Sequence, residues 1–276
     1  MGVVFEYIVY SITTRCNINC PGCFRIGSGS VDLALPIFIK NLPLLKEIGC
    51  KYLNLSGGEP LLHPQWRNFV KLSKKQGIIP MLSTNGLLLE DMSEPILRDL
   101  AVLAIPLDGD TALVNDKVRG VGHFEKATSL ILEYLRGKFP FILKVNTVVN
   151  RNNYLRLNNI LKVFTNNERI IWKLFQFTSR GNFSMQEDDL SISTEDFREI
   201  VGKIKKIRDI KCKITFLAAD GASNYLIVSP KGDLFIPTVS SYRKICNLIN
   251  DDAKGFIEKD QNLKGNSFSQ VVLGCG

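Results

Sequence analysis

The sequence contains no apolar run long enough to span a membrane, and its opening residues are not expected to be a cleavable leader. A membrane helix needs about 18 consecutive apolar residues, and no segment of the 276 residues reaches that length without charges. The opening residues MGVVFEYIVYSITTR begin apolar, without the basic start or the small-residue cleavage site of a signal peptide. These absences predict a cytosolic protein with no membrane partner.

The sequence also lacks the cysteine and histidine pairs of a disulfide framework or a zinc finger. It has seven cysteines and two histidines. An odd number of cysteines in a cytosolic chain argues against disulfides and for metal binding or catalysis. Four are scattered singly, and we interpret them as small buried or incidental thiols: Cys50, Cys212, Cys246 and Cys275. The other three lie within eight residues of one another.

No recognised DNA- or RNA-binding motif accompanies the positive net charge. Lysine and arginine number 35 against 27 aspartates and glutamates, a formal net charge of +8. The positive residues concentrate at 72–77 and 203–213, near the ends of predicted helices, where solvated helix faces explain most of them. The remaining excess fits an anionic small-molecule substrate better than duplex nucleic acid.

Short apolar runs alternate with amphipathic segments through the first 177 residues. The predicted strands are 3–13, 51–57, 78–86, 101–109, 141–149 and 169–177. The predicted helices are 36–49, 65–77, 93–100, 123–137 and 153–164. Ser93 is the expected N-cap of its helix. Strands that alternate with helices form parallel sheets through right-handed crossovers. The pattern therefore predicts an α/β protein with a partial (β/α)6 barrel of the TIM type over residues 1–180.

The rhythm changes after residue 177. A helix over 193–207 begins at Ser193, with Asp196 in the position of a capping box. A β-hairpin over 224–237 turns at SPKGD. We therefore expect residues 181–276 to form a C-terminal extension, a helix and a β-hairpin, that packs on the barrel of a monomeric protein.

Four polar, glycine-rich segments follow the predicted strands. A cysteine-rich loop follows the first strand, SGGEP the second, STNG the third and PLDGD the fourth. Barrel enzymes build their active sites at the carboxyl ends of the strands. The four segments are therefore expected to converge on one site.

Cys16, Cys20 and Cys23 lie in the loop after the first strand, in the segment CNINCPGC. Thiolates are soft ligands that suit zinc and iron–sulfur clusters. Structural zinc takes four ligands, commonly as two close pairs, and the sequence has no second pair. A redox dithiol needs only Cys20 and Cys23. A [4Fe–4S] cluster held by three cysteines leaves one iron free to bind a small molecule.

The spacing C-x3-C-x2-C, followed by the aromatic Phe24, resembles the signature of the radical S-adenosylmethionine (SAM) superfamily. Six further segments agree with that family in order: LNLSGGEP, STNG, PLDGD, NDKVRG, KVNTVVNRNN and IIWKLFQF. The resemblance implies a [4Fe–4S] cluster and SAM as cofactors, and an electron donor such as flavodoxin or ferredoxin. The reduced cluster would cleave SAM to methionine and a 5′-deoxyadenosyl radical that abstracts hydrogen from the substrate.

The resemblance also implies roles for individual residues. The cluster ligands would be Cys16, Cys20 and Cys23. The residues expected to contact SAM are Phe24, Gly57, Gly58, Glu59, Ser83, Asn85, Arg119 and Asn146. Within this set the glycines and Glu59 would face the methionine amine, and Arg119 the carboxylate.

Several of these roles have structural alternatives. Glu59 is equally well a carboxylate that only supports its loop, and Arg119 a solvated loop arginine. Asn146 points either inward to the ribose or towards a turn. Asp108 either belongs to the site or only caps the turn after the fourth strand.

The middle of the chain resembles viperin-like enzymes and, more distantly, the molybdopterin-pathway cyclases, through KVNTVVNRNN, WKLFQF and NYLIVSPKGDLF. Viperin-like enzymes dehydrate a nucleoside triphosphate to its 3′-deoxy-3′,4′-didehydro form. The resemblance therefore implies a nucleotide substrate. Its candidate phosphate ligands are Lys144, Arg151 and Lys173, and Tyr225 is a further candidate catalytic residue. Strand alternation places Lys144 and Asn146 on one face.

Two alternatives to the nucleotide substrate remain. Ile171 stands where viperin-like sequences have a basic residue before Trp172, and PLDGD followed by NDKVRG resembles peptide-modifying members of the superfamily. The substrate is then a peptide or another small metabolite. A non-catalytic iron–sulfur or zinc-binding module would keep the cysteines, but it has no use for SGGEP or STNG.

Overall fold

The fold is a single large sheet flanked by helices. The computed structural model describes residues 5–21, 23, 25–26, 29–164, 166–178, 190–221, 225–238, 241–252 and 255–257. The strands are β1 (Tyr7–Thr13), β2 (Tyr52–Gly57), β3 (Ile79–Ser83), β4 (Val102–Pro106), β5 (Ile142–Val149), β6 (Ile170–Gln176), β7 (Lys213–Leu217), β8 (Leu226–Val228), β9 (Asp233–Pro237) and β10 (Tyr242–Asn247). The α-helices are α1 (Leu35–Glu47), α2 (Trp66–Lys75), α3 (Ala112–Arg119), α4 (His123–Arg136), α5 (Leu157–Lys162) and α7 (Thr194–Lys205). Short 3-10 helices are η1 (Pro60–Leu62), η2 (Pro95–Asp99) and η3 (Tyr154–Arg156).

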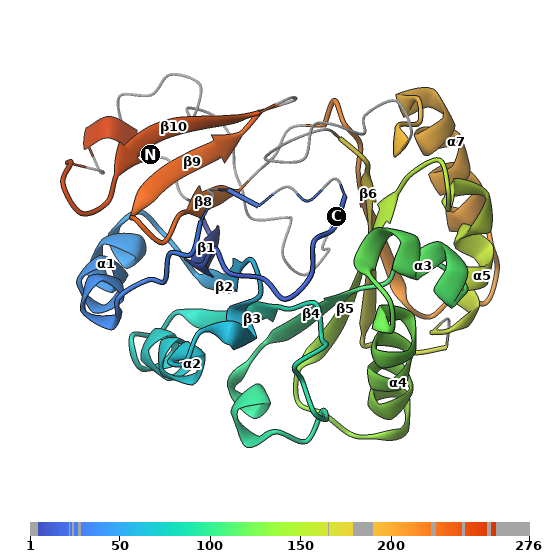
Figure 1. Ribbon diagram of the computed structural model, residues 1–276, viewed down its shortest axis with the longest axis horizontal. Coiled ribbons are helices and arrows are strands. Elements are labelled where there is room, and N and C mark those ends of the chain that lie inside the picture. The colour runs from blue at the N-terminus through green and yellow to red at the C-terminus, as the bar shows by residue number, and fades with distance from the viewer. Residues whose placement is uncertain are drawn as a thin grey trace.

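The sheet has ten strands in the order β10-β9-β8-β1-β2-β3-β4-β5-β6-β7. Neighbouring strands from β8 through β1 to β7 pair in parallel, and only β9 and β10 add antiparallel edges. Helices α1 and α2 lie outside β1–β3, and α4, α5 and α7 lie outside β4–β6 (Figure 1). The predicted partial barrel is confirmed, since a curved parallel sheet carries its helices on the outer side.

Alternation along the strands separates an apolar outer face from a mixed inner face. In β5, Leu143 and Val145 belong to the main core between sheet and helices. Lys144 and Asn146 therefore face the barrel interior, as period-two alternation requires. A smaller apolar cluster of Tyr7, Met81 and Val102 occupies the inner face, near the amino ends of β1 and β4. Between that cluster and the carboxyl ends of the strands, the inner face carries polar side chains such as Lys144 and Asn146.

One predicted helix is wrong. The segment 93–100 forms only the 3-10 helix η2, and its N-cap is Glu94 instead of Ser93. The Ser93 hydroxyl donates to Asp91 Oδ1, so it is engaged in a turn before the helix. Pro95 supplies no backbone N–H, and Leu100 N donates to Leu97 O, which closes a tight turn in place of an α-helical one. The connection therefore adds no full helix between β3 and β4.

The region after residue 190 extends the sheet at both ends. The cap of α7 is confirmed, because Ser193 Oγ accepts a hydrogen bond from Asp196 N at 3.0 Å. The hairpin is also confirmed, with β8 and β9 joined by a turn in which Gly232 has φ +82°. β7 pairs with β6 and β8 with β1, so this region extends the wall of the partial barrel on both sides. The predicted division at residue 180 lies outside the described residues.

Among the elements of the described residues, α3, β7, β10 and the 3-10 helix η1 were not predicted. Among the described residues, no helix combines the length and the apolar character that crossing a bilayer requires.

Candidate functional site

The loop after β1 is anchored at the carboxyl edge of the sheet just before its first cysteine. Arg15 Nε and Nη2 donate to the two carboxylate oxygens of Asp32, at 3.0 and 2.6 Å. Asp32 Oδ1 also accepts the Thr13 hydroxyl at 2.6 Å, and Thr14 Oγ1 donates to Gly29 O at 2.8 Å. The backbone that leads into the cysteine loop therefore has a defined position.

The three cysteines differ in burial. Cys20 is buried, whereas Cys16 and Cys23 are half-buried. Cys23 N donates to Cys20 O at 3.2 Å, which closes a turn between them. Burial raises the pKa of the Cys16 and Cys20 thiols. Phe24, predicted to contact SAM, lies outside the described residues.

The donor chemistry of this loop fits an iron–sulfur cluster better than zinc. Among the described residues, no three histidine, cysteine, aspartate or glutamate side chains converge on one metal position. A zinc ion needs its ligands around one centre, whereas a four-iron cluster takes each thiolate at a separate iron. Cys23 is close enough to affect the ionisation of both Cys16 and Cys20. Three neighbouring thiols, with no fourth beside them in the described part of the chain, are a donor set that suits such a cluster.

Gly57 and Gly58 lie directly against the cysteine loop. Gly58 N donates to Thr13 O at 2.8 Å, and Glu59 N donates to Arg15 O at 2.7 Å. A Cβ on Gly57 would lie 2.2 Å from Thr13 O, and one on Gly58 would lie 2.1 Å from Arg15 O. We expected these glycines to face the methionine amine of SAM. The structure adds a reason for glycine at both positions, because only glycine lets this segment pack on the backbone of the cysteine loop.

Glu59 is a fully buried carboxylate that connects two strand ends. Its Oε1 accepts the N–H of Leu61 at 3.0 Å and the Thr84 hydroxyl at 2.7 Å, and its Oε2 accepts the N–H of Asn85 at 2.7 Å. Burial raises its pKa, and these hydrogen bonds oppose that rise. The supporting role is therefore visible in the structure, and contact with the methionine amine stays a prediction.

Asn85 joins the end of β3 to the cysteine loop. Its Nδ2 donates to Asn17 Oδ1 at 2.7 Å. Ser83 points into the barrel, where its hydroxyl donates to Asn54 Oδ1 at 3.0 Å, and Asn54 Nδ2 donates to the Tyr7 hydroxyl at 3.0 Å. Sequence analysis missed Asn17, Asn54 and Tyr7. Asn17 had a local signal, since it lies inside the cysteine motif, but Asn54 and Tyr7 read as ordinary strand residues.

Arg119 is not a solvated loop arginine. It ends α3, and its Nε forms an ion pair with Asp108 Oδ2 at 2.5 Å. Its Nη1 lies 3.9 Å from Cys20 Sγ. Asp108 is fully buried, and its Oδ1 also accepts the N–H of Val148 at 2.7 Å. The structure therefore brings Arg119 to the cysteine loop and Asp108 to Arg119.

Lys144 and Lys173 are two buried lysines inside the barrel. Their exposed fractions are 8% and 7%. Among the described residues, neither ammonium group has a hydrogen-bond or ion-pair partner, although Lys173 Nζ lies 5.4 Å from the ring centroid of Phe175. Burial and the charge of Lys173 lower the pKa of Lys144 to about 7, and burial lowers that of Lys173 to about 8.

The other predicted substrate residues lie in three different environments. Asn146 pairs in register with Lys173, and its Oδ1 is buried with no hydrogen-bond partner among the described residues. Arg151 is exposed, in the turn after β5. Tyr225 packs edge-on against Tyr7, with ring centroids 6.1 Å apart, near the amino end of β1. The structure thus groups Asn146 with the lysines and gives Tyr225 a packing partner at the opposite end from the cysteine loop.

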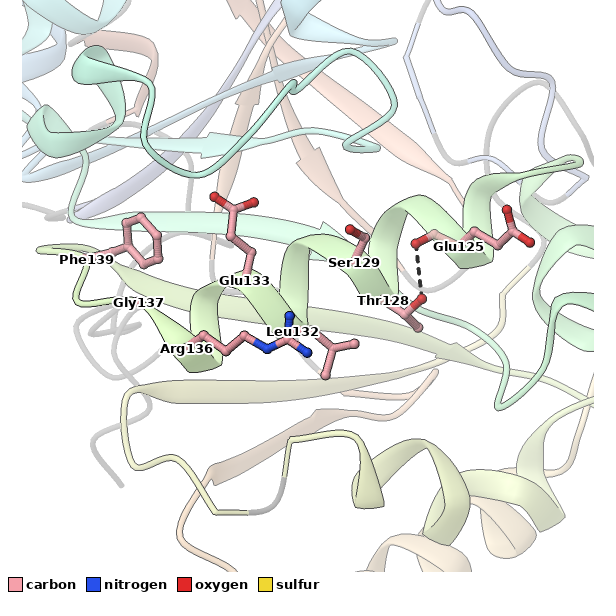
Figure 2. Close-up of a pocket in the computed structure, with 8 residues that line it drawn as sticks. All are labelled: Glu125, Thr128, Ser129, Leu132, Glu133, Arg136, Gly137 and Phe139. Carbon is pink, nitrogen blue, oxygen red and sulfur yellow. Dashed lines mark hydrogen bonds between the residues drawn. The ribbon is translucent and has the colours of Figure 1, made fainter.

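Two hollows have different characters. A small cavity of about 40 Å³ lies beside the cysteine loop. Its lining residues are Cys20, Pro21, Cys23, Val118, Arg119, Val148, Asn150, Phe177 and Leu190. A larger open hollow of about 670 Å³ lies along α4, where Glu133 and Arg136 project in different directions (Figure 2). Glu133 already accepts a hydrogen bond from Met92 N. The chemistry therefore favours the smaller cavity as part of the site.

Sequence comparison adds independent information. The profile of the radical SAM superfamily matches residues 10–162. The chain is 32% identical over 163 residues to the AdoMet-dependent heme synthase of Methanosarcina barkeri, covering 57% of this chain and 45% of that protein. It is 28% identical over 176 residues to the S-adenosylmethionine-dependent nucleotide dehydratase RSAD2 of Siniperca chuatsi, covering 60% and 49%. The chain therefore spans about half the length of these relatives.

A longer match is the GTP 3′,8-cyclase of Petrotoga mobilis, which is 27% identical over 272 residues and covers 93% of this chain and 81% of that protein. Among solved structures, SuiB of Streptococcus suis bound to precursor peptide SuiA has a TM-score of 0.75 at 13% identity, covering 95% of this chain and 66% of SuiB. The AdoMet-bound anSMEcpe has a TM-score of 0.72 at 14% identity, covering 93% and 81%. The structural matches show a shared fold.

Proposed function

Because this chain belongs to the radical SAM superfamily, we propose that it removes a hydrogen atom from an anionic nucleotide bound inside the barrel. Members of the superfamily are enzymes that use a [4Fe–4S] cluster and SAM, and this chain is one of them. The finer proposal is the dehydration of a nucleoside triphosphate to its 3′-deoxy-3′,4′-didehydro product. A peptide or another small metabolite is the alternative substrate.

When bound, the two cofactors supply a 5′-deoxyadenosyl radical that abstracts hydrogen from the substrate. In this proposal Cys16, Cys20 and Cys23 hold the cluster. The backbone at Gly57 and Gly58 borders the methionine part of SAM. The Nε of Arg119 pairs with Asp108 and its Nη1 lies near Cys20 Sγ. Its Nη2 is the group that would bind the SAM carboxylate.

The observation that carries the substrate proposal is a pair of lysines inside the barrel, neither of which has a partner among the described residues. A buried ammonium without a counter-ion is costly, and two on adjacent strands also repel each other. A polyphosphate would relieve both costs, because it places several negative charges beside Lys144 and Lys173. The buried Oδ1 of Asn146 is an acceptor suited to a ribose hydroxyl.

The relatives support this substrate class in part. The names of the RSAD2 and cyclase relatives refer to nucleotides. Those of the heme synthase and of the mycofactocin maturase MftC from Mycobacterium tuberculosis refer to other chemistry. The inner lysines are therefore a more direct argument than any one relative. A flavodoxin- or ferredoxin-like electron donor remains part of the proposal.

The test is an anaerobic assay with the reconstituted enzyme. Each nucleoside triphosphate is added singly with SAM and dithionite, and 5′-deoxyadenosine is measured. We expect one nucleotide to stimulate its formation well above the level without substrate and to lose one water. If none does, the nucleotide proposal fails while membership of the superfamily stands.

A further inference from the structure

Asp108 and Arg119 form a buried ion pair at the edge of the cysteine loop. The Asp108 side chain has no exposed surface and that of Arg119 is 18% exposed. Burial alone would lower the pKa of Arg119, but the Asp108 carboxylate raises it above its usual value. Arg119 therefore carries its charge in the folded protein, and the ion pair lies in a region from which water is largely excluded.

The carboxylate is held from several directions, so it determines where the guanidinium lies. The backbone of Asp108 is fixed in its turn, because its N–H donates to Asn115 Oδ1 at 2.8 Å. Asn153 Nδ2 donates to Asp108 O at 2.8 Å, and Val148 N donates to Asp108 Oδ1. Arg119 is the last residue of α3, and Gly120, with φ +97°, ends that helix. Asp108 thus fixes the position of the Arg119 side chain, which projects from the end of the short helix α3.

The guanidinium faces the sulfur of a predicted cluster ligand. Arg119 Nη1 lies 3.9 Å from Cys20 Sγ, a distance at which unit charges interact strongly when water is excluded. His123 lies near the same pair, but its pKa is lowered to about 4 by burial and by Arg119, so it is neutral at pH 7. Apart from the neighbouring Cys23 thiol, the charge near Cys20 therefore comes from Arg119 and from its counter-ion Asp108.

From this arrangement we propose that Asp108 is a positioning residue that holds Arg119 against Cys20, and that the pair sets the reduction potential of the cluster. This inference rests on the proposed role of Cys20 as a cluster ligand. A positive charge beside a ligand sulfur stabilises the reduced, more negative state of a cluster and raises its potential. The Asp108 carboxylate offsets part of that effect.

Two substitutions separate this role from a merely structural one, because they change the local charge in opposite directions. Asp108→Asn keeps the shape and an oxygen that can accept the Arg119 Nε–H, so Arg119 stays against Cys20 while a negative charge is lost, and the cluster becomes easier to reduce. Arg119→Met keeps most of the apolar stem and removes a positive charge, so the cluster becomes harder to reduce. At one fixed potential we expect the ratio of reduced to oxidised cluster to change by roughly tenfold, upward in the first variant and downward in the second.

A matched control is available on the same side of the barrel. Arg156 Nη1 pairs with Asp110 Oδ1 at 2.9 Å, between the segments that precede α3 and α5, and Arg156 is half exposed. Asp110→Asn and Arg156→Met remove the same charges from an ion pair for which the structure shows no cysteine contact. These two variants should leave the potential at the wild-type value.

The measurement is a redox titration of the reconstituted full chain followed by electron paramagnetic resonance, with iron counted per chain. Shifts of the same sign in Asp108→Asn and Arg119→Met, equal shifts in the controls, or no shift would overturn the inference. If Asp108→Asn does not take up iron, Arg119→Met is compared with Arg119→Lys, which retains the charge; equal potentials there would overturn it. Absence of any cluster in the wild-type chain would instead overturn the proposed function.

Discussion

Charged side chains have protein partners in one region of the molecule and none in another, among the described residues. The first region, the cysteine edge, is the group of strand ends around residues 16–23; the second is the barrel interior around Lys144 and Lys173. At the edge, Arg15 pairs with Asp32, Arg119 pairs with Asp108, and the Glu59 carboxylate accepts three hydrogen bonds. In the interior, Lys144 and Lys173 have no such partner among the described residues. The edge is therefore organised by protein contacts alone, whereas the part of the interior that the structure describes supplies no counter-ion for its two lysines; on the proposed function, the substrate supplies it.

The difference has a thermodynamic consequence. Satisfied buried charges add rigidity to the loop that is proposed to hold the cofactors. Unpaired buried lysines reduce the stability of the fold, since the charged form is disfavoured there. Sites that bind ligands commonly retain such strain. On the proposed function, cofactor binding belongs to the organised edge and substrate binding to the strained interior.

Loss of a cluster ligand is the largest expected effect. Cys20→Ala should abolish the visible absorption and the bound iron of the reconstituted protein, because the other two thiols cannot replace it. Cys50→Ala is the control, since Cys50 is a buried thiol in the main core, and it should keep its cluster. An unchanged spectrum in Cys20→Ala would show that Cys20 does not hold the cluster, and the proposed cofactor site would be wrong.

A side chain at Gly58 is expected to have the next largest effect. In Gly58→Ala the new Cβ would lie 2.1 Å from Arg15 O, so the cysteine loop must shift and stability falls by about 1–3 kcal/mol. Chemical denaturation measures this loss. Gly202→Ala is the control, because a Cβ there meets no atom within 4 Å, and it should be neutral or slightly stabilising.

Removal of an inner lysine tests the other half of the comparison. Lys173→Met should weaken nucleotide binding by roughly 10–100-fold, the loss of one charge-assisted contact, and leave SAM affinity unchanged. Stability should not fall, because an unpaired buried ammonium is replaced by an apolar group. Calorimetry gives both affinities, and Lys71→Met on the exposed surface of α2 is the control. Equal loss of both affinities would mean that Lys173 supports the fold.

The pH dependence of binding is the smallest expected effect. The pKa values of Lys144 and Lys173 are lowered to about 7 and about 8, and a bound polyanion favours their charged forms. Nucleotide affinity should therefore fall as pH rises through this range, by at most about tenfold per pH unit for each lysine. Lys144→Met should make nucleotide affinity less dependent on pH than in the wild type. Because the phosphate titrates equally in both proteins, the difference between the two profiles isolates the contribution of Lys144. An identical profile in that variant would contradict the assignment.

Stability should show the opposite trend in the absence of nucleotide. The folded lysines release their protons at lower pH than the unfolded ones, whose ordinary pKa is 10.5. Unfolding therefore takes up protons between about pH 7 and 10, and this contribution to stability rises with pH across that window.

Much of the fold and part of the site followed from local patterns. The strand and helix alternation predicted β1 to β6, and Ser193 with Asp196 predicted the start of α7. The segment 93–100 was misread because its helical composition did not reveal that Pro95 and the Asp91 turn limit it to η2. β7 was missed because Lys213–Leu217 is short and follows a basic segment, and only pairing with β6 makes it a strand.

The cofactor chemistry could be predicted from the sequence. The spacing of three cysteines is a short-range property that can be read from the sequence itself, as can the segments after each strand. The partners of the charged groups were decided only by the tertiary structure. Glu59 meets Asn85, Arg119 meets Cys20, and Gly58 meets Arg15 across long stretches of chain. Such contacts depend on which strand ends become neighbours in the folded sheet, so no local pattern could specify which charged side chains would be paired and which would have no protein partner among the described residues.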